Sequence, residues 1–212
     1  MMGPAKGPPQ RIVHEGRYAR LEPIAATHAR DLFEAAGPER YTYLLSYAPG
    51  DVDEMSARLE RESAIDDPLA FAVIDKSTRR AEGRQSLMRI TPEHGVIEIG
   101  GILWGDRIAR TRVATEAQYL FTRHVFDDLG YRRYEWKCNA LNLPSRRAAE
   151  RFGFTFEGIF RQHQIIKGQN RDTAWFAMLD GDWARIKAGY ERWLDPSNFE
   201  ADGSQKSKLS FD

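Results

Sequence analysis

The sequence "VIEIGGILWGDRIARTRVATEAQYLF", residues 96–121, combines a strand, a link and a helix. Residues 96–104 are almost entirely apolar and contain two adjacent glycines, which predicts a buried central strand with a bulge or a close backbone approach. From Val113 onward, apolar or small residues recur with the spacing of one helical face. The link places Arg110 and Arg112 at the helix start, where the macrodipole is already positive. Since a bound anion would offset this charge, we expect an anion site there.

The composition of the whole chain excludes several classes of protein. Its 212 residues include 31 Lys and Arg and 31 Asp and Glu, whereas general nucleic-acid binders carry a basic excess. No stretch is apolar enough to cross a membrane or to serve as a secretory signal, so we expect a cytoplasmic protein. The single cysteine, Cys138, excludes an intrachain disulfide, and the five histidines form no HxxxH pair. We therefore expect no metal site and no membrane contact.

The order of predicted elements favours a mixed α/β domain. Apolar runs and turn signals predict one strand, two helices, three strands, a helix, a strand, a helix, two strands and a last helix. Residues 1–15, rich in Pro and Gly, are predicted to be a disordered leader. Residues 16–195 form the single predicted domain, and residues 196–212 read as a polar tail.

Four segments in order carry a resemblance to a known family: "IEIGGILW", "RTRVATEA", "NLPSRRAAERFGF" and "EGIFR". Over residues 18–179 the chain resembles the GNAT superfamily of acetyl-CoA-dependent N-acetyltransferases, and in particular the ribosomal-protein N-terminal (alanine/serine) branch. The resemblance implies a twisted, mostly antiparallel sheet of six to seven strands with a central splayed parallel pair, flanked by helices on both faces. It also implies acetyl-CoA as co-substrate, no metal, and direct acyl transfer to a primary amine.

The resemblance also implies where coenzyme A binds. In the family, backbone groups of the splayed strand bind the pantetheine arm, and a glycine-containing loop wraps the pyrophosphate. This chain departs from that loop, since Ala109 stands at its Gln/Arg position, Arg112 at its first glycine, and only Ala114 matches. We hypothesise that Arg110 and Arg112 bind the diphosphate directly; the alternative is that both are solvated and the site is degenerate. The expected coenzyme A contacts are Ile102, Leu103, Trp104, Arg110, Thr111, Arg112, Val113, Ala114, Thr115, Asn142, Ser145 and Arg146.

The helix "NLPSRRAAERFG" matches the family's N-x-x-S entry at Asn142 and Ser145. Many members carry a tyrosine in this helix as general acid, but Ala149 stands at that position here. The resemblance therefore assigns the proton-donor role to Ser145, while helix capping is an equally open role for a serine there. Arg146 or Arg147 reaches the nucleotide phosphate in this interpretation, and a solvated helix face is the alternative.

A candidate general base lies on the central strand. Glu98 stands between two isoleucines, where a buried carboxylate needs a partner, so it is either the base or an ion-paired glutamate at a sheet end. Asp172 and Glu157 are weaker candidates. Cys138 fits better as a small apolar residue on a strand than as a nucleophile.

The acceptor region is expected in the tyrosine-rich segment "ERYTYLLSY", residues 39–47, together with His163 and Trp175. Core packing is the alternative use of these aromatic residues. The function expected is acetyl transfer to a protein N-terminus or a small amine. The competing hypothesis is a catalytically silent acyl-CoA-binding or protein-interaction module. The sequence leaves the oligomeric state open, with a homodimer as the general expectation.

Overall fold

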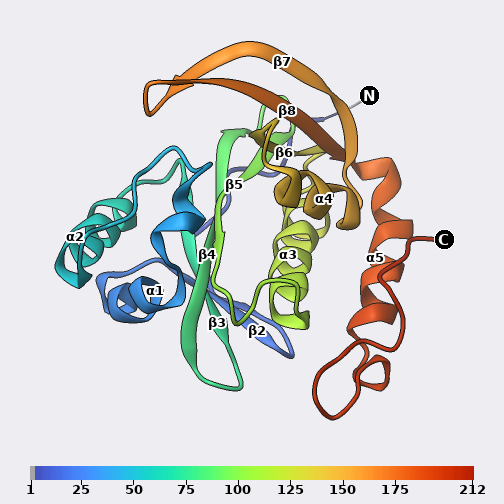
Figure 1. Cartoon of the computed structure of the whole chain (residues 1–212). Coiled ribbons are helices and arrows are strands. Elements are labelled where there is room, and N and C mark those ends of the chain that lie inside the picture. The colour runs from blue at the N-terminus through green and yellow to red at the C-terminus, as the bar shows by residue number, and fades with distance from the viewer. Residues whose placement is uncertain (1–2) are drawn as a thin grey trace.

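The fold is centred on one eight-stranded sheet, in a computed structural model that describes residues 3–212. The strand order is β1-β2-β3-β4-β5-β6-β8-β7, and only the central β5–β6 pair is parallel (Figure 1). The sequence predicted six to seven strands, and the further one is the short edge strand β1. The strands are β1 His14–Glu15, β2 Ala19–Pro23, β3 Leu69–Asp75, β4 Arg80–Thr91, β5 Val96–Trp104, β6 Arg133–Asn139, β7 Thr155–Ile166 and β8 Gln169–Leu179.

Helices cover both faces of this sheet, as Figure 1 shows, with α1 and α2 on one side and α3 and α5 on the other. Their bounds are α1 Ala29–Ala35, α2 Val52–Ser63, α3 Arg112–Arg123, α4 Leu143–Arg151 and α5 Asp180–Leu194. A π-helical turn, His124–Asp128, extends α3. Short 3-10 turns lie at Ala26–His28, Pro38–Tyr41 and Pro196–Asn198.

Strand β3 illustrates how the sequence separates the two layers. Its side chains point alternately to opposite faces. Leu69, Phe71 and Val73 enter the larger core under α3 and α5, whereas Ala70 and Ala72 pack with α1 and α2. Because both faces are covered, the strand reads as a continuous apolar run.

Both chain ends differ from their predicted states. Within the expected disordered leader, the amide of Ala5 donates to the carbonyl of Pro92 (2.9 Å), and Tyr131 donates to the carbonyl of Gly7 (3.1 Å). Residues 1 and 2 lie outside the described residues. In the expected polar tail, Phe199 is buried and Phe211 packs against Tyr190, with ring centres 5.5 Å apart and the rings tilted by 50°. The N-terminal segment docks on the domain through backbone hydrogen bonds and the C-terminal segment through two phenylalanines, which the composition of both segments concealed.

Among the described helices, none has both the length and the apolar character that a membrane span requires.

The N-terminal segment is fixed by a buried histidine. The His14 ring lies 4.6 Å from the His124 ring and 5.5 Å from Phe71, and its Nε2 has no partner among the described residues. The pKa of His14 is lowered from 6.5 to about 4, mainly by burial and also by the charges of His124 and Arg123, while Asp128 opposes the shift. His14 is therefore neutral in the folded protein at neutral pH.

We predict an acid-sensitive loss of stability that depends on His14. As the pH falls, the imidazole of His14 is protonated in the unfolded state before it is protonated in the folded state. The stability that neutral His14 contributes is therefore complete above pH 6.5 and is lost as the pH falls from 6.5 to 4. Between pH 7 and pH 5 this amounts to about 2 kcal/mol. Urea unfolding of His14→Phe should lack this component, whereas the exposed control His94→Phe should retain it. Equal pH dependence in both variants would contradict the assignment.

Candidate active site

The site begins where β5 and β6 part. The two strands pair only between residues 96–99 and 133–136. Beyond this point β5 continues along β4, while β6 continues along β8. Facing backbone edges of both strands are thus left without a strand partner within the described part of the chain. Unpaired backbone N–H and C=O groups are available to a ligand.

The adjacent glycines of β5 sit at this divergence. Gly101 adopts φ +58°, a conformation that glycine tolerates best, and the β4–β5 register shifts between Arg84 and Ser86. A Cβ at Gly100 would lie 2.2 Å from the sulfur of Met88. The bulge and the close approach predicted from the glycine pair are both confirmed.

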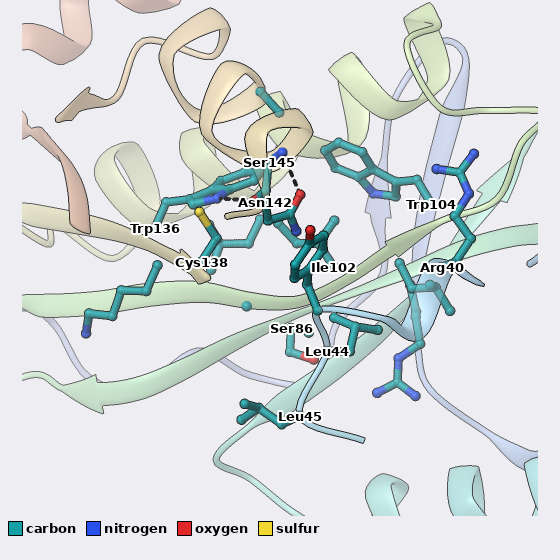
Figure 2. A pocket seen from close by; sticks show the side chains of 18 of the residues that line it. Arg40, Leu44, Leu45, Ser86, Ile102, Trp104, Trp136, Cys138, Asn142 and Ser145 are labelled. Carbon is teal, nitrogen blue, oxygen red and sulfur yellow. Dashed lines mark hydrogen bonds between the residues drawn. The ribbon is translucent and has the colours of Figure 1, made fainter. Parts of the chain in front are cut away.

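A cavity of about 1030 Å³ extends from the gap. Figure 2 shows Asn142 and Ser145 on one side of it, with Ile102 and Trp104 nearby and Leu44, Leu45 and Arg40 from the segment after α1. Among the candidate base and the expected coenzyme A contacts, those lining it are Glu98, Ile102, Leu103, Trp104, Arg110, Asn142 and Ser145. The parts of the expected site that lie on β5 and at the start of α4 therefore meet in one cavity.

The start of α3 retains its anion-binding features. Thr111 is the N-cap, and its Oγ1 accepts from the amide of Val113 at 3.2 Å. The amides of Arg112 and Ala114 have no hydrogen-bond acceptor among residues 3–212. The first turn also contains no acidic residue. This helix end is positive and unneutralised, as predicted.

The two arginines of this link have different environments. Arg110, at φ +67°, lines the cavity. Arg112 does not; its guanidinium lies 4.5 Å from the ring centre of Tyr18 and 5.3 Å from that of Phe199. The expected role of Arg112 as a second anion ligand is therefore not supported, because stacking on aromatic rings directs it elsewhere.

The next residues of α3 also differ from the expected contacts. Val113, Ala114 and Thr115 are buried and do not line the cavity. Thr115 Oγ1 donates to the carbonyl of Thr111 at 3.0 Å and accepts from Arg151 at 3.1 Å. Its hydroxyl is engaged within the protein, so these three side chains are not presented to the cavity.

Arg151, at the end of α4, is a cavity residue that the sequence analysis missed. Its guanidinium lies over Phe152 and Trp193, at 5.2 and 5.1 Å, and has no carboxylate within 4.0 Å among the described residues. Burial lowers its pKa. In the sequence it is one of several arginines in a polar helix, so its burial gave no signal. An anion entering the cavity would supply its missing partner.

Asn142, and not Ser145, caps α4. The Asn142 Oδ1 accepts from the amide of Ser145 at 3.1 Å, while Ser145 Oγ accepts from Trp136 Nε1 at 3.0 Å (Figure 2). Burial raises the pKa of the Cys138 thiol, against a hydrogen bond from Ser145 that lowers it. The Ser145 hydroxyl thus lies beside a sulfur atom and points its oxygen toward an indole donor.

Glu98 is buried in an ion-pair cluster. Its Oε2 binds Lys137 Nζ and Arg89 Nε, each at 2.9 Å, and Oε1 has no partner among the described residues. Burial raises the pKa of Glu98, although the Lys137 ammonium opposes the shift. Lys137 also binds Glu135, at 2.6 Å. The ion-paired alternative is thus realised, and one oxygen remains free to accept a proton.

The β7–β8 hairpin arches over the sheet toward α2 in Figure 1. Four of its residues line the cavity, namely His163, Gln164, Arg171 and Thr173. At its turn, Lys167 Nζ donates to the carbonyl of Tyr41 at 2.7 Å and lies 4.9 Å from the ring centre of Tyr47. Tyr41 and His163 line the cavity as expected, together with Tyr43. Tyr47 does not, so the prediction holds for part of the segment.

Four further predicted residues lie outside the cavity lining. Arg146 donates to the carbonyl of Ala140 at 3.3 Å, and its neighbour Arg147 lines the cavity instead. Trp175 packs beneath Lys137, at 3.9 Å. Glu157 is paired with Arg133 and Asp172 accepts from the amide of Gln162, so neither weaker candidate is placed to act as a base.

The described residues contain no group of three or more His, Cys, Asp or Glu side chains suited to a metal ion. The site thus combines three features: two strands that part, a helix start without acidic residues, and a cavity lined by arginine and lysine side chains. These features suit an extended ligand that carries phosphate groups. The sequence signature described as "Acetyltransferase (GNAT) domain" matches residues 19–155, and the chain belongs to this family.

Solved structures agree with this family. A GCN5-related N-acetyltransferase from Brucella melitensis is 54% identical, with a TM-score of 0.95 over 98% of this chain and 96% of that one. A probable acetyltransferase (GNAT family) from Chromobacterium violaceum is 35% identical, with a TM-score of 0.79 over 87% and 93%. The ribosomal-protein-S5-alanine acetyltransferase from Vibrio fischeri, at 17% identity, a TM-score of 0.62 and coverage of 81% and 98%, shares the fold. No curated protein matches the chain.

We predict that Arg151→Met separates ligand binding from stability. Methionine retains much of the packing over Phe152 and Trp193 while removing a buried, unpaired charge, so the free energy of unfolding should change by less than about 1 kcal/mol. Affinity for coenzyme A, measured by calorimetry, should fall roughly tenfold, as expected for one charge-assisted contact. The exposed control Arg61→Met should change neither quantity. A variant that unfolds readily yet binds normally would make Arg151 a purely structural residue.

Proposed function

We propose that this protein transfers an acetyl group from acetyl-CoA to a primary amine. The observation that carries the proposal is the cavity at the parting of β5 and β6, which has the half-buried, unpaired Arg151 on its wall and extends to the link before α3. That arrangement suits a long ligand with amide groups along its arm and phosphates at one end. Family membership supports the same reading.

The residues present fit coenzyme A. Arg110, Arg147 and Arg151 offer guanidinium groups to its phosphates, and the first amides of α3 lie next to Arg110 in the chain. The open edge of β5, beyond the residues paired with β6, offers backbone groups to the amides of the pantetheine arm. When bound, acetyl-CoA supplies the activated acyl group.

The transfer joins the amine nitrogen to the acetyl carbon and breaks the carbon–sulfur bond. The amine loses a proton, and the departing thiolate gains one. We assign to Glu98 the role of accepting the proton that the amine loses, because its Oε1 is free and burial raises its pKa. We assign hydrogen bonding to the departing sulfur to Ser145, whose hydroxyl oxygen already accepts from Trp136.

A first experiment tests the cofactor and the reaction together. Coenzyme A at a hundredfold excess over its dissociation constant should stabilise the protein by about 2.7 kcal/mol, measured by thermal unfolding. Mass spectrometry should then detect a 42-Da (about one acetyl group) increase on an amine from a mixed panel of peptides and small amines. Binding without transfer to any amine would favour the silent acyl-CoA-binding module, and no binding at all would refute both.

The catalytic assignments predict a pH signature. Glu98→Gln should lower kcat by about 100-fold and abolish the acid limb of kcat/KM, which should lie above the ordinary glutamate pKa of 4.5 because burial raises it. Ser145→Ala should lower kcat with little change in KM. Glu135→Gln is the matched control, since it binds the same Lys137 but does not line the cavity. An unchanged acid limb in Glu98→Gln would assign the base elsewhere.

A further inference from the structure

The charges of the cavity are strongly unbalanced. Nine arginine and lysine side chains line it, but the carboxylates among its lining residues are three glutamates. Five of these cations have a carboxylate within 4.0 Å. The four without such a partner among the described residues are Arg110, Arg147, Arg151 and Arg171.

Three of these unpaired cations belong to the region assigned to coenzyme A. Arg110 precedes α3, and Arg147 and Arg151 project from α4. Arg171 does not belong to this group, because it lies on β8 in the β7–β8 hairpin, whose turn contacts Tyr41 through Lys167. The phosphates of the cofactor therefore leave Arg171 unexplained.

Arg171 is half-buried and has no anionic partner among the described residues. Its Nη1 donates to Gln164 Oε1 at 2.6 Å, while its Nε is buried and has no partner among the described residues. Burial lowers its pKa, as it does for Arg151. Hydrogen bonding to a neutral amide does not compensate for burying a guanidinium group.

The groups around Arg171 do not neutralise it. The charges of Glu98 and Arg89 both act on it, but Arg89 and Lys137 already bind Glu98. Lys137 also holds Glu135. Both carboxylates are thus already bound by other cations, and Arg171 has no carboxylate within 4.0 Å among the described residues.

We propose that the acceptor is a primary amine that carries a carboxylate, and that Arg171 binds this carboxylate while the amine lies at Glu98. The inference rests on the proposed acetyl transfer and names its substrate class. Arginine binds carboxylates through two parallel hydrogen bonds, and Nε is one of the donors such a pair uses. Polycationic acceptors such as polyamines are disfavoured, because the cationic lining repels them.

Matched pairs of acceptors test this assignment. Glycine is compared with glycinamide, and a peptide beginning with aspartate with the same peptide beginning with asparagine. In each pair the carboxamide has nearly the shape of the carboxylate without its charge. For at least one pair, the wild-type protein should show a kcat/KM roughly tenfold higher for the carboxylate, the value of one charge-assisted contact. A preference within the glycine pair would indicate a small amino acid as acceptor, whereas a preference within the peptide pair would indicate an acidic N-terminus.

Variants then locate the contact. Arg171→Met should reduce the carboxylate-to-carboxamide ratio to about one, and Arg171→Lys should restore part of it because the charge returns without the second donor. Arg161→Met, an exposed arginine on β7 outside the cavity lining, should leave the ratio unchanged. A merely structural role would lower kcat/KM for both members of a pair equally.

The outcomes distinguish the two proposals. Wild-type transfer to amines with no preference for carboxylates, or a preference that survives Arg171→Met, overturns this inference and leaves the acetyltransferase proposal intact. Binding of coenzyme A with no transfer to any acceptor in the panel overturns both.

Discussion

The parting of β5 from β6 is the constraint on which the rest of the structure depends. Parallel pairing ends at Ile99 and Trp136, after which each strand keeps only its outer antiparallel neighbour. A continuous sheet would have filled this space with its own hydrogen bonds. Because it does not, backbone groups in the middle of a buried sheet are available to a ligand, with a preorganised geometry set by β4 and β8.

The elements around the gap place different chemistry at its two ends. The α3 entrance and the basic side of α4 contribute a helix end and guanidinium groups, which suit phosphates. The β7–β8 hairpin contributes aromatic and polar side chains, and Lys167 ties its turn to the segment after α1. Glu98 lies between these contributions, buried by the strands and held by cations from β4 and β6. The same fold therefore places the proposed phosphate-binding region and the proposed acceptor region in one cavity.

Much of the fold and part of the site could be predicted from local sequence. The glycine pair predicted the β5 bulge, Thr111 and Asn142 stand at helix starts as their residue types favour, and the alternation of elements gave the mixed α/β class. These features depend on neighbours within a few residues. Arg112, Arg151 and Arg171 were misjudged or missed, because their environment depends on Tyr18, Thr115 and Gln164, which lie elsewhere in the fold. Sequence composition likewise hid the docking of both chain ends, which depends on backbone hydrogen bonds at the N-terminal end and on two phenylalanines at the C-terminal end.

Local charge pairing, and not the overall charge, distinguishes the arginines that we propose as ligand contacts. The chain has no net charge, and most cations of the cavity are neutralised by nearby glutamates or aspartates. An arginine such as Arg84, paired with Glu62, already has its partner and gains little from a ligand. Arg151 and Arg171 are half-buried without one, so the free protein bears a desolvation cost that a bound anion relieves. One lies on the α4 wall and the other on the β8 wall of a single cavity. If two ligands meet in this cavity, as we propose, each unpaired arginine stabilises the state in which the ligand on its own wall is bound.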